Sequence, residues 1–312
     1  MSRKRIRAHA NPLSDVDIDW PLTPDAVPWN QHYPAYLGPG NVPTALATAP
    51  SASSSSSTPD QRAPLAEVRI ADIGCGFGGM SVALSEIFPD KLVLGLEIRD
   101  KVVDIVKERI DKLRKQAADN AAAAGAGAGS AAAASASASA SSSTSGFLST
   151  NSASPSPAPW FSACTSYAPG SAPFTYQNVS VVKTNIMKFA PNYFRRGQLD
   201  SIFILFADPH FKKSNHRRRV ISANFLAIYA YILKVGGLIY TITDVKDLHE
   251  WEVSWLDKHP LFERIPNEEL ANDAGFIAMH HATEEGQKVT RLSGQKYPAV
   301  FRRIAAKERS EE

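Results

Sequence analysis

The chain has 312 residues, of which 34 are Lys or Arg and 31 are Asp or Glu, so its formal net charge is +3. Two cysteines in this length, Cys75 and Cys164, exclude a fold held together by disulfides and are typical of a reducing compartment. No uncharged apolar run approaches about 18 residues, so no membrane-spanning helix is expected, and the acidic residues soon after Pro12 argue against an organellar presequence.

The chain opens with a basic segment. Four basic residues precede the first acidic residue, and they are Arg3, Lys4, Arg5 and Arg7. Residues 1–38 are therefore interpreted as a basic arm and lead-in. Arms of this kind commonly become ordered when they bind RNA, so we expect this one to contact nucleic acid.

Two stretches of low sequence complexity interrupt the chain. Residues 39–64 contain a run of serines, and residues 116–173 are rich in Ala, Gly and Ser, with no formal charge between Asp119 and Lys183. Both are predicted to be disordered insertions, since neither has an apolar stripe to bury, and long solvated loops cost little closure entropy. The rest, residues 65–115 and 174–306, is predicted to form one domain, followed by a charged tail at 307–312.

Within the predicted domain, apolar runs alternate with amphipathic segments. The predicted strands span 67–73, 92–98, 179–183, 201–206 and 238–243, and the predicted helices span 78–88, 100–114, 222–233 and 248–258. Residues 234–237 are predicted as a turn, and one or two further strands are expected around Glu263 and at 299–304. This alternation predicts an α/β fold with a mostly parallel sheet and helices on both faces.

Glycines and polar residues stand where the predicted strands end. They are Gly74, Glu97, Asn185, Asp208 and Asp244. The carboxyl ends of parallel strands meet at one edge of a sheet, and ligands of such sheets bind there. These residues are therefore expected to lie close together in a ligand site.

A glycine-rich turn follows the first predicted strand, with Gly74, Gly76, Gly78 and Gly79. The spacing fits both a dinucleotide-binding turn and the related turn of methyltransferases. Glu97, at the end of the next strand, can accept hydrogen bonds from ribose hydroxyls in either case. Asp72 favours a methyl donor, because a carboxylate attracts its cationic groups and would repel a pyrophosphate. The turn is therefore predicted to bind S-adenosylmethionine rather than a nicotinamide cofactor.

The chain also resembles the tRNA (guanine-N7)-methyltransferase family, in its eukaryotic branch. The resemblance covers most of the chain outside the two insertions, through residues 4–12, 71–79, 94–99, 206–213, 235–244, 259–263, 283–286 and 301–304. One departure is Ala207, where the family usually has Pro, and we expect it to be tolerated because Pro209 still fixes the following φ.

The resemblance implies a class I methyltransferase (Rossmann-like) fold. It also implies transfer of a methyl group from S-adenosylmethionine to N7 of the guanine in the variable loop of tRNA. It implies a partner as well, a WD40 β-propeller subunit that lacks the active site and supports tRNA binding. The expected location is the nucleus, with the cytoplasm as a second possibility. No metal site is predicted.

By the same resemblance, the donor site is built by Gly74, Glu97, Arg99, Asn185, Ile186 and Leu205, and is closed from the C-terminal side by Thr283 and Glu285. Plainer interpretations stay open for several of these residues. Asn185 has the residue type of an ordinary turn, Leu205 that of core packing, and Thr283 that of a helix N-cap. Arg99 can simply pair with a charged neighbour at the surface.

Asp208 is the predicted catalytic residue. N7 of guanine carries a lone pair and needs no deprotonation, so catalysis consists mostly of alignment. A carboxylate can accept hydrogen bonds from the guanine N1–H and exocyclic amine, and these bonds strengthen as the ring becomes cationic. Adenine has no proton at N1, so the same contacts select guanine.

A basic cluster follows Asp208 and consists of Lys212, Lys213, Arg217, Arg218 and Arg219. It is expected to open the next helix, where cations oppose the helix dipole, so a purely structural role explains it poorly. Phosphate contacts explain it better. Together with the arm, this predicts RNA-binding residues that include Arg5, Arg7, Lys212, Lys213, Arg217 and Arg218.

Two other functions remain open. Residues 208–211 distantly resemble the D-P-P-Y loop with which amino-group methyltransferases grip an exocyclic amine, although His210 replaces the second Pro. A non-catalytic RNA-binding subunit with the same fold is the other alternative. The presence of Asp72, Gly74, Glu97 and Asp208 speaks against it.

Overall fold

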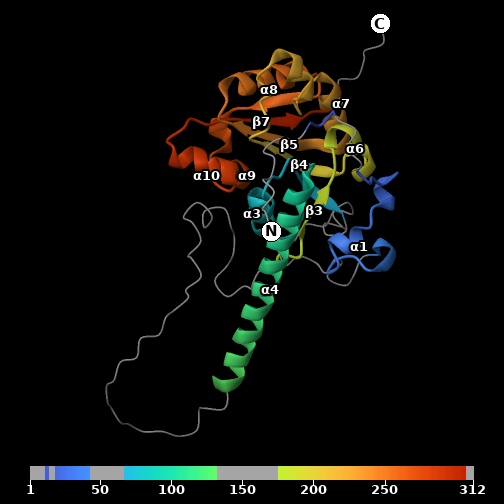
Figure 1. The fold of residues 1–312 in the computed structure, drawn as a ribbon, viewed down its shortest axis with the longest axis vertical. Coiled ribbons are helices and arrows are strands. Elements are labelled where there is room, and N and C mark those ends of the chain that lie inside the picture. Colours follow the sequence, from blue (N-terminus) through green and yellow to red (C-terminus); the bar gives the residue numbers. More distant parts are fainter. Residues whose placement is uncertain (1–10, 14–17, 43–66, 132–174, 307–312) are drawn as a thin grey trace, which may run out of the picture.

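The computed structural model describes residues 11–13, 18–42, 67–131 and 175–306. Its seven-stranded sheet has the order β3-β2-β1-β4-β5-β7-β6 (Figure 1). The strands are β1 (Val68–Ile73), β2 (Leu92–Glu97), β3 (Val179–Lys183), β4 (Leu199–Leu205), β5 (Leu233–Thr243), β6 (Phe262–Ile265) and β7 (Tyr297–Arg303). Strands β1 to β5 are parallel, whereas β7 is antiparallel to both of its neighbours.

Helices cover both faces of this sheet. They are α1 (Trp29–His32), α3 (Gly79–Ile87), α4 (Asp100–Ala131), α6 (Ile186–Tyr193), α7 (Ala223–Ile232), α8 (Lys246–Lys258), α9 (Ala274–Met279) and α10 (Glu284–Arg291). One core lies between the sheet and α6, α7 and α8, and the other lies between the sheet and α3, α4 and α9. The predicted α/β architecture is confirmed, and the strand order reverses next to β1, which favours a ligand site there.

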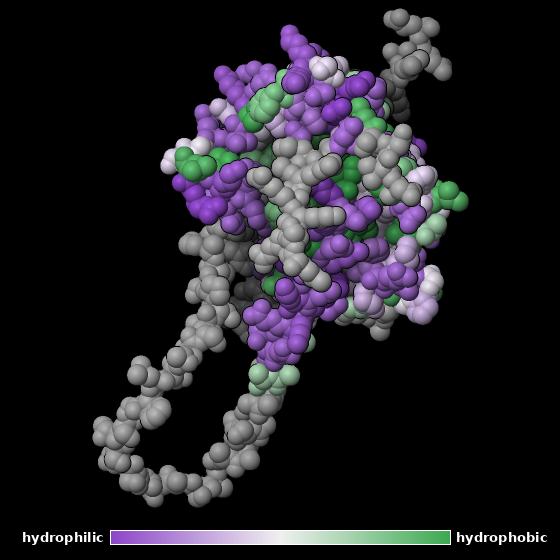
Figure 2. Space-filling view, in the orientation of Figure 1, coloured by the Kyte–Doolittle hydropathy of each residue, from purple (hydrophilic) through white to green (hydrophobic). Residues whose placement is uncertain are grey.

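The two cores follow from the alternation of side chains along buried strands. On β2, Leu92, Leu94 and Leu96 belong to one core and Val93 to the other, and none is more than 1% exposed. A parallel strand covered on both faces reads as a continuous apolar run, which is why its position could be predicted. The outer surface seen in Figure 2 is largely hydrophilic where the structure describes it.

Helix α4 corrects one sequence-based boundary. The helix predicted at 100–114 continues to Ala131 and projects well beyond the sheet (Figure 1). It therefore runs into the segment from residue 116 that was predicted to be disordered. Alanine is the strongest helix former, and the alanines after residue 116 extend a helix that is already nucleated. Most of the two predicted insertions (43–64 and 132–173), the arm before residue 11 and the tail after 306 lie outside the described residues.

The turn predicted at 234–237 lies inside β5. Leu199 pairs with Leu233 and Ser201 pairs with Leu238, so the intervening residues bulge out of the ladder. Gly236 has a φ of +82°, which glycine adopts readily. Glycines are favoured in bulges as well as in turns, so the sequence pattern of a turn here marks a bulge. The remaining element bounds agree with the predicted ones within about two residues, which is the usual uncertainty of helix and strand ends.

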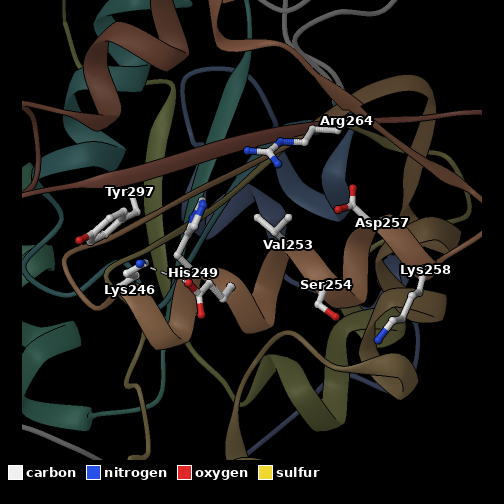
Figure 3. Close-up of a pocket in the computed structure, with 9 residues that line it drawn as sticks. Lys246, His249, Val253, Ser254, Asp257, Lys258, Arg264 and Tyr297 are labelled. Atoms are coloured by element: carbon white, nitrogen blue, oxygen red, sulfur yellow. Dashed lines mark ion pairs between the residues drawn. The ribbon is translucent and has the colours of Figure 1, made fainter.

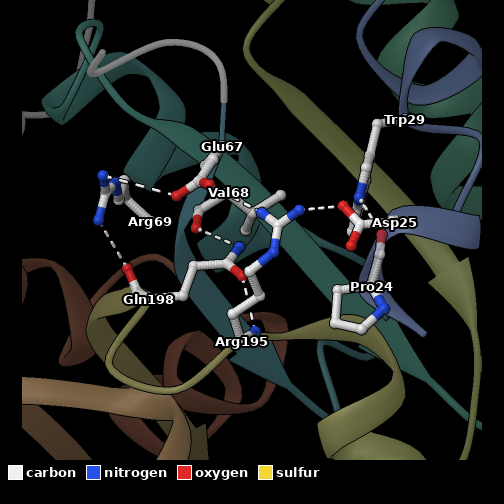
Figure 4. A network of polar contacts seen from close by, with 8 residues as sticks. All are labelled: Pro24, Asp25, Trp29, Glu67, Val68, Arg69, Arg195 and Gln198. Carbon is white, nitrogen blue, oxygen red and sulfur yellow. Dashed lines mark hydrogen bonds and ion pairs between the residues drawn. The ribbon is translucent and has the colours of Figure 1, made fainter. Parts of the chain in front are cut away.

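A polar network fixes the N-terminal lead-in near the amino end of β1 (Figure 4). Arg195 pairs with Glu67 at 2.9 Å and with Asp25 of the lead-in. Gln198 donates to the carbonyl oxygen of Val68 at 3.0 Å, which ties the same network to β1. The network lies at the end of the sheet opposite the predicted ligand site, so its role is architectural.

Helix α8 carries a buried acid, Glu252, that is 2% exposed and whose Oε2 has no hydrogen-bond partner among the described residues. Burial raises its pKa to about 8, although the charge of Arg219 opposes the shift. A pKa above the unfolded value of 4.5 means that this contribution to stability is complete at low pH and is lost as pH rises toward 8.

We therefore expect Glu252→Gln to remove one pH-dependent contribution to folding. Between pH 5 and pH 8, the free energy of unfolding of the wild type should fall relative to the variant by on the order of 1 kcal/mol per pH unit. Urea denaturation of both proteins across this range measures the difference. Two parallel curves would show that Glu252 is ionised in the folded state throughout.

Candidate active site

A cavity of about 920 Å³ opens at the carboxyl ends of β1, β2, β4 and β5. Its lining includes residues 72–77, 96–99, 184–187, 205–210, 244–245 and 283–285, together with Pro12, Arg218, Lys288 and Arg291. Every residue predicted for the donor site and for catalysis lies in this lining. The exposed cations Lys212, Lys213 and Arg217 do not, and Arg5 and Arg7 lie outside the described residues.

The glycine-rich turn forms the floor of the cavity. Gly74 has a φ of +72°, and no atom lies within 4 Å of the position that a Cβ would take on it. Its backbone N–H donates to the carbonyl oxygen of Leu96 at 2.7 Å, which fixes the turn against β2. A Cβ on Gly79 would lie 2.4 Å from the carbonyl oxygen of Ala282, so only glycine permits this close approach. The turn therefore leaves open space for a ligand at Gly74, while close backbone packing at Gly79 holds its other side in place.

Glu97 stands at the end of β2 and is 4% exposed. Its Oε1 accepts hydrogen bonds from the backbone N–H of Ile98 and of Arg99, at 2.8 and 2.9 Å. Its Oε2 accepts from the backbone N–H of Gly76 at 3.2 Å and from Nη2 of Arg99 at 2.9 Å. The predicted neighbour Arg99 is thus an ion-pair partner of Glu97, and the pair holds the carboxylate against the glycine turn.

Asp72 lies behind the turn and is 2% exposed. Ser81 donates to its Oδ2 at 2.6 Å. Burial raises the pKa of Asp72 to about 7; the Ser81 hydrogen bond opposes this, and the charges of Glu284 and Glu97 add to it. Near neutral pH the side chain is therefore only partly ionised, and a cationic ligand beside it would lower the pKa again.

Asn185 caps helix α6. Its Oδ1 accepts from the backbone N–H of Met187 at 3.1 Å, and its Nδ2 donates to the carbonyl oxygen of Pro12 at 2.6 Å. Asn185 is therefore a helix N-cap and not an ordinary turn residue, and its side chain also lines the cavity. Ile186 and Leu205 are 7% and 8% exposed and form part of the apolar wall of the cavity. Both also belong to the hydrophobic cores, so each side chain packs in a core and lines the cavity.

Asp208 lies on the loop after β4, with a side chain that is 28% exposed. Its Oδ1 accepts from the backbone N–H of His210 at 3.2 Å. Phe206 and His210, on either side of it, have φ values of +49° and +47°. Positive φ is uncommon for residues other than glycine and occurs at functional sites where the surrounding structure enforces it. The loop containing Ala207 thus presents Asp208 to the cavity in an enforced conformation.

The C-terminal wall begins with Thr283, whose Oγ1 accepts from the backbone N–H of Gly286 at 2.9 Å. Thr283 is therefore the predicted N-cap, here of α10. Glu285 pairs with Lys288 at 2.8 Å on the exposed side of this helix.

Sequence reasoning missed the connection between this wall and the glycine turn. Arg109 of α4 donates to Glu284 at 2.5 Å and to the carbonyl oxygen of Phe77 at 2.9 Å. These partners are far apart in the sequence, and no local pattern marks them. Their contact joins α4, α10 and the turn into one frame around the cavity.

The structure of the basic cluster differs from two predictions. Its residues form a 3₁₀ helix, Lys213–Arg218, and α7 begins only at Ala223, so the cluster does not open the next helix and the helix-dipole argument fails. Arg219 is 1% exposed, so the prediction that it contacts phosphate is wrong. Lys212, Lys213 and Arg217 are exposed, and the RNA-binding prediction for them stands untested.

Reversing two of these charges, Lys212→Glu with Lys213→Glu, should weaken tRNA binding. The slope of log affinity against log salt should become shallower by roughly 2, because two phosphate contacts are lost. Donor affinity should not change. Binding titrations at several salt concentrations measure this, with the exposed Lys258→Glu as a matched control. A parallel fall in donor affinity would show that the cluster supports the fold instead.

A second cavity, of about 710 Å³, lies against α8 (Figure 3). Two lysines, Lys246 and Lys258, and two acids, Glu250 and Asp257, line it, and the ring of His249 lies 5.7 Å from that of Tyr297. None of the predicted site residues line it. Among the described residues, no group of three or more His, Cys, Asp or Glu side chains is arranged for a metal ion, and no helix is long and apolar enough to span a membrane.

Comparison with known proteins gives consistent matches. The chain matches the family model described as "Putative methyltransferase" over residues 66–128 and 124–299. It is 43% identical over 304 residues to the tRNA (guanine-N(7)-)-methyltransferase of Oryza sativa subsp. indica, which covers 97% of this chain and 91% of that protein. The proteins of the same name from Arabidopsis thaliana and Mus musculus are each 40% identical, over 96% of this chain and 90% and 89% of theirs.

Proposed function

The chain belongs to the tRNA (guanine-N(7)-)-methyltransferase family and is an enzyme of that activity, and we propose that its strand-end cavity methylates N7 of the variable-loop guanine of tRNA. The observation that carries the proposal is the placement of Glu97 and Asp208 in one cavity. They stand at the ends of β2 and β4, the two neighbours of β1, so the glycine turn after β1 lies between them.

The donor half of the cavity fits S-adenosylmethionine. Gly74 leaves open space for the donor, Asp72 supplies negative charge for its cationic groups, and Glu97 supplies acceptor oxygens for its ribose. When bound, S-adenosylmethionine supplies an electrophilic methyl group. We assign the ribose hydroxyls to Glu97, the adenine edge to Asn185 and Ile186, and the apolar wall to Leu205. The N-terminus of α10, with Thr283 and Glu285, closes the site.

The acceptor half contains Asp208. Its carboxylate accepts hydrogen bonds from the guanine N1–H and exocyclic amine, while N7 attacks without losing a proton. Positive charge develops on the ring during transfer, and the carboxylate stabilises that charge. Adenine offers no N1–H and would leave the carboxylate without this bond, which supports guanine as the substrate.

The loop conformation favours guanine N7 over an exocyclic amine. In the D-P-P-Y loop of amino-group methyltransferases, the third position is Pro, whose ring fixes φ near −65°. Here that position is His210, with a φ of +47°, which Pro cannot adopt. The loop therefore has a geometry that a D-P-P-Y sequence could not reach.

We further propose that the chain is the catalytic subunit of a heterodimer with a WD40 β-propeller protein and acts in the nucleus. Both proposals rest on the resemblance to the eukaryotic branch of the family. In the heterodimer, the propeller subunit would support tRNA binding and this chain would carry the cavity.

The test is methyl transfer from labelled S-adenosylmethionine to total tRNA, with and without the propeller subunit, followed by nucleoside analysis. We expect 7-methylguanosine as the product, and a requirement for the propeller would establish an obligate pair. N6-methyladenosine instead would support the amino-group alternative. No product in either reaction would contradict the proposal.

A further inference from the structure

Arg219 is the largest fully buried side chain in the part of the chain that the structure describes, and it carries a permanent charge. Its Nε donates to the carbonyl oxygen of Pro209 at 2.8 Å, and its Nη2 pairs with Asp247 of α8 at 3.1 Å. The guanidinium also lies 4.8 Å from the ring centre of Trp251, on the same helix. Arg219 therefore bridges α8 to the residue that directly follows Asp208.

Burying this charge is costly for stability alone. The side chain of Asp247 is 74% exposed, and burial raises the pKa of the nearby acid Glu252 to about 8, so that acid is mostly neutral near pH 7. The two acids therefore compensate only part of the desolvation of the guanidinium. Buried ion pairs can often be replaced by apolar residues without loss of stability. Stability alone therefore does not explain why Arg219 is buried here. Its bond to the carbonyl oxygen of Pro209, next to Asp208, suggests a role in the catalytic loop.

The Asp208 loop needs support from outside. Phe206 and His210 have positive φ values, and such strained backbone persists in residues other than glycine only where the surrounding structure enforces it. On the strand side, the backbone N–H of Phe206 donates to the carbonyl oxygen of Ile242 at 2.7 Å. On the other side, Arg219 bonds Pro209 from ten residues further along the chain, and its bond to Asp247 ties it to the separate element α8.

Helix α8 holds Arg219 in turn. Asp247 and Trp251 are four residues apart, so they lie on one face of the helix. Nε1 of Trp251 donates to the carbonyl oxygen of Ile221 at 2.8 Å, which fixes the ring over the guanidinium. The connection thus runs from α8 through Arg219 to Pro209 and the catalytic loop.

We propose that Arg219 is a positioning residue that fixes the Asp208 carboxylate in the orientation that reads guanine, and that Asp247 and Trp251 anchor it. This rests on the proposed function. At 1% exposure, Arg219 acts through the loop and does not contact substrate phosphate.

The test is a double-mutant cycle of Arg219→Lys with Asp208→Asn, measured by single-turnover methylation of tRNA. Lys keeps the charge but cannot bond Pro209 and Asp247 together as the planar guanidinium does. We expect the transfer rate to fall by about 10- to 100-fold, since small misplacements of catalytic groups cost this much. The KM for tRNA and the donor Kd should stay within about twofold. In the Asp208→Asn background, Arg219→Lys should have no further effect, because the two residues act as one unit.

Arg303→Lys is the matched control, because Nε of Arg303 also donates to a carbonyl oxygen, that of Ala230, at 2.8 Å and away from the cavity. It should leave the transfer rate unchanged. If Arg219→Lys does not fold, Asp247→Asn, at the exposed end of the same ion pair, is measured in its place. We expect it to lower the transfer rate by less, and to have no effect in the Asp208→Asn background. The proposal would be overturned if the double variant lost transfer rate by the product of the two single losses. An equal loss of transfer rate in Arg303→Lys would also overturn it. Absence of 7-methylguanosine from the wild type would instead overturn the proposed function.

Discussion

Replacing Asp208 with Ala should lower kcat for tRNA methylation by about 100- to 1000-fold, the usual cost of removing one group that stabilises transition-state charge. The carboxylate is proposed to contact the base and not the donor, so the donor Kd should not change. Steady-state kinetics with nucleoside analysis, together with donor binding by calorimetry, measure both quantities.

Two further variants sharpen this prediction. Asp208→Asn keeps the size of the side chain but removes its charge, and it should lose nearly as much activity as Asp208→Ala. Asp257→Asn makes the same substitution at an exposed site in the second cavity and should leave kcat unchanged. Full activity in Asp208→Ala would show that this carboxylate takes no part in reading guanine.

Glu97→Ala should raise the donor Kd by about 100-fold, because hydrogen bonds to a charged acceptor contribute about 1.5–3 kcal/mol each and Glu97 is assigned two ribose hydroxyls. The substitution also releases Arg99 and the N–H of Gly76, which loosens the glycine turn. Calorimetric titration with S-adenosylhomocysteine, the demethylated product, measures the effect without turnover.

The affinity for tRNA separates this effect from general damage. It should stay the same in Glu97→Ala, because Glu97 is assigned to the donor half of the cavity and not to the acceptor half. Glu263→Gln is the control, since Glu263 is an exposed acid that lies 4.0 Å from Arg302 and outside the cavity. If donor and tRNA affinity fell together, Glu97 would be a residue of the fold and not of the site.

The central strands could be predicted from sequence because they are buried on both faces and therefore read as unbroken apolar runs. The bounds of β3 were predicted without error, and those of β2 within one residue. The strand ends then located Gly74, Glu97 and Asp208 without any tertiary information, since the carboxyl edge of a parallel sheet collects them.

What could not be predicted depends on contacts between distant segments. Arg217 and Arg219 look alike in sequence, yet one is exposed and the other is buried against Trp251, because only the fold decides which of them faces α8. The pairing of Arg109 with Glu284 likewise requires α4 and α10 to meet. Alanines that read as low complexity continued α4, because nucleation had already been achieved by the preceding amphipathic turns.

The most direct test of the account is methyl transfer to a tRNA in which the target guanosine is replaced by 7-deazaguanosine. This base keeps the N1–H and the exocyclic amine that Asp208 is proposed to read, but it has a carbon in place of N7. If N7 is the acceptor, the substituted tRNA should bind as tightly as the natural one and accept no methyl group. Methyl transfer to it at a rate near that of natural tRNA would show that N7 is not the acceptor and would contradict the proposed reaction.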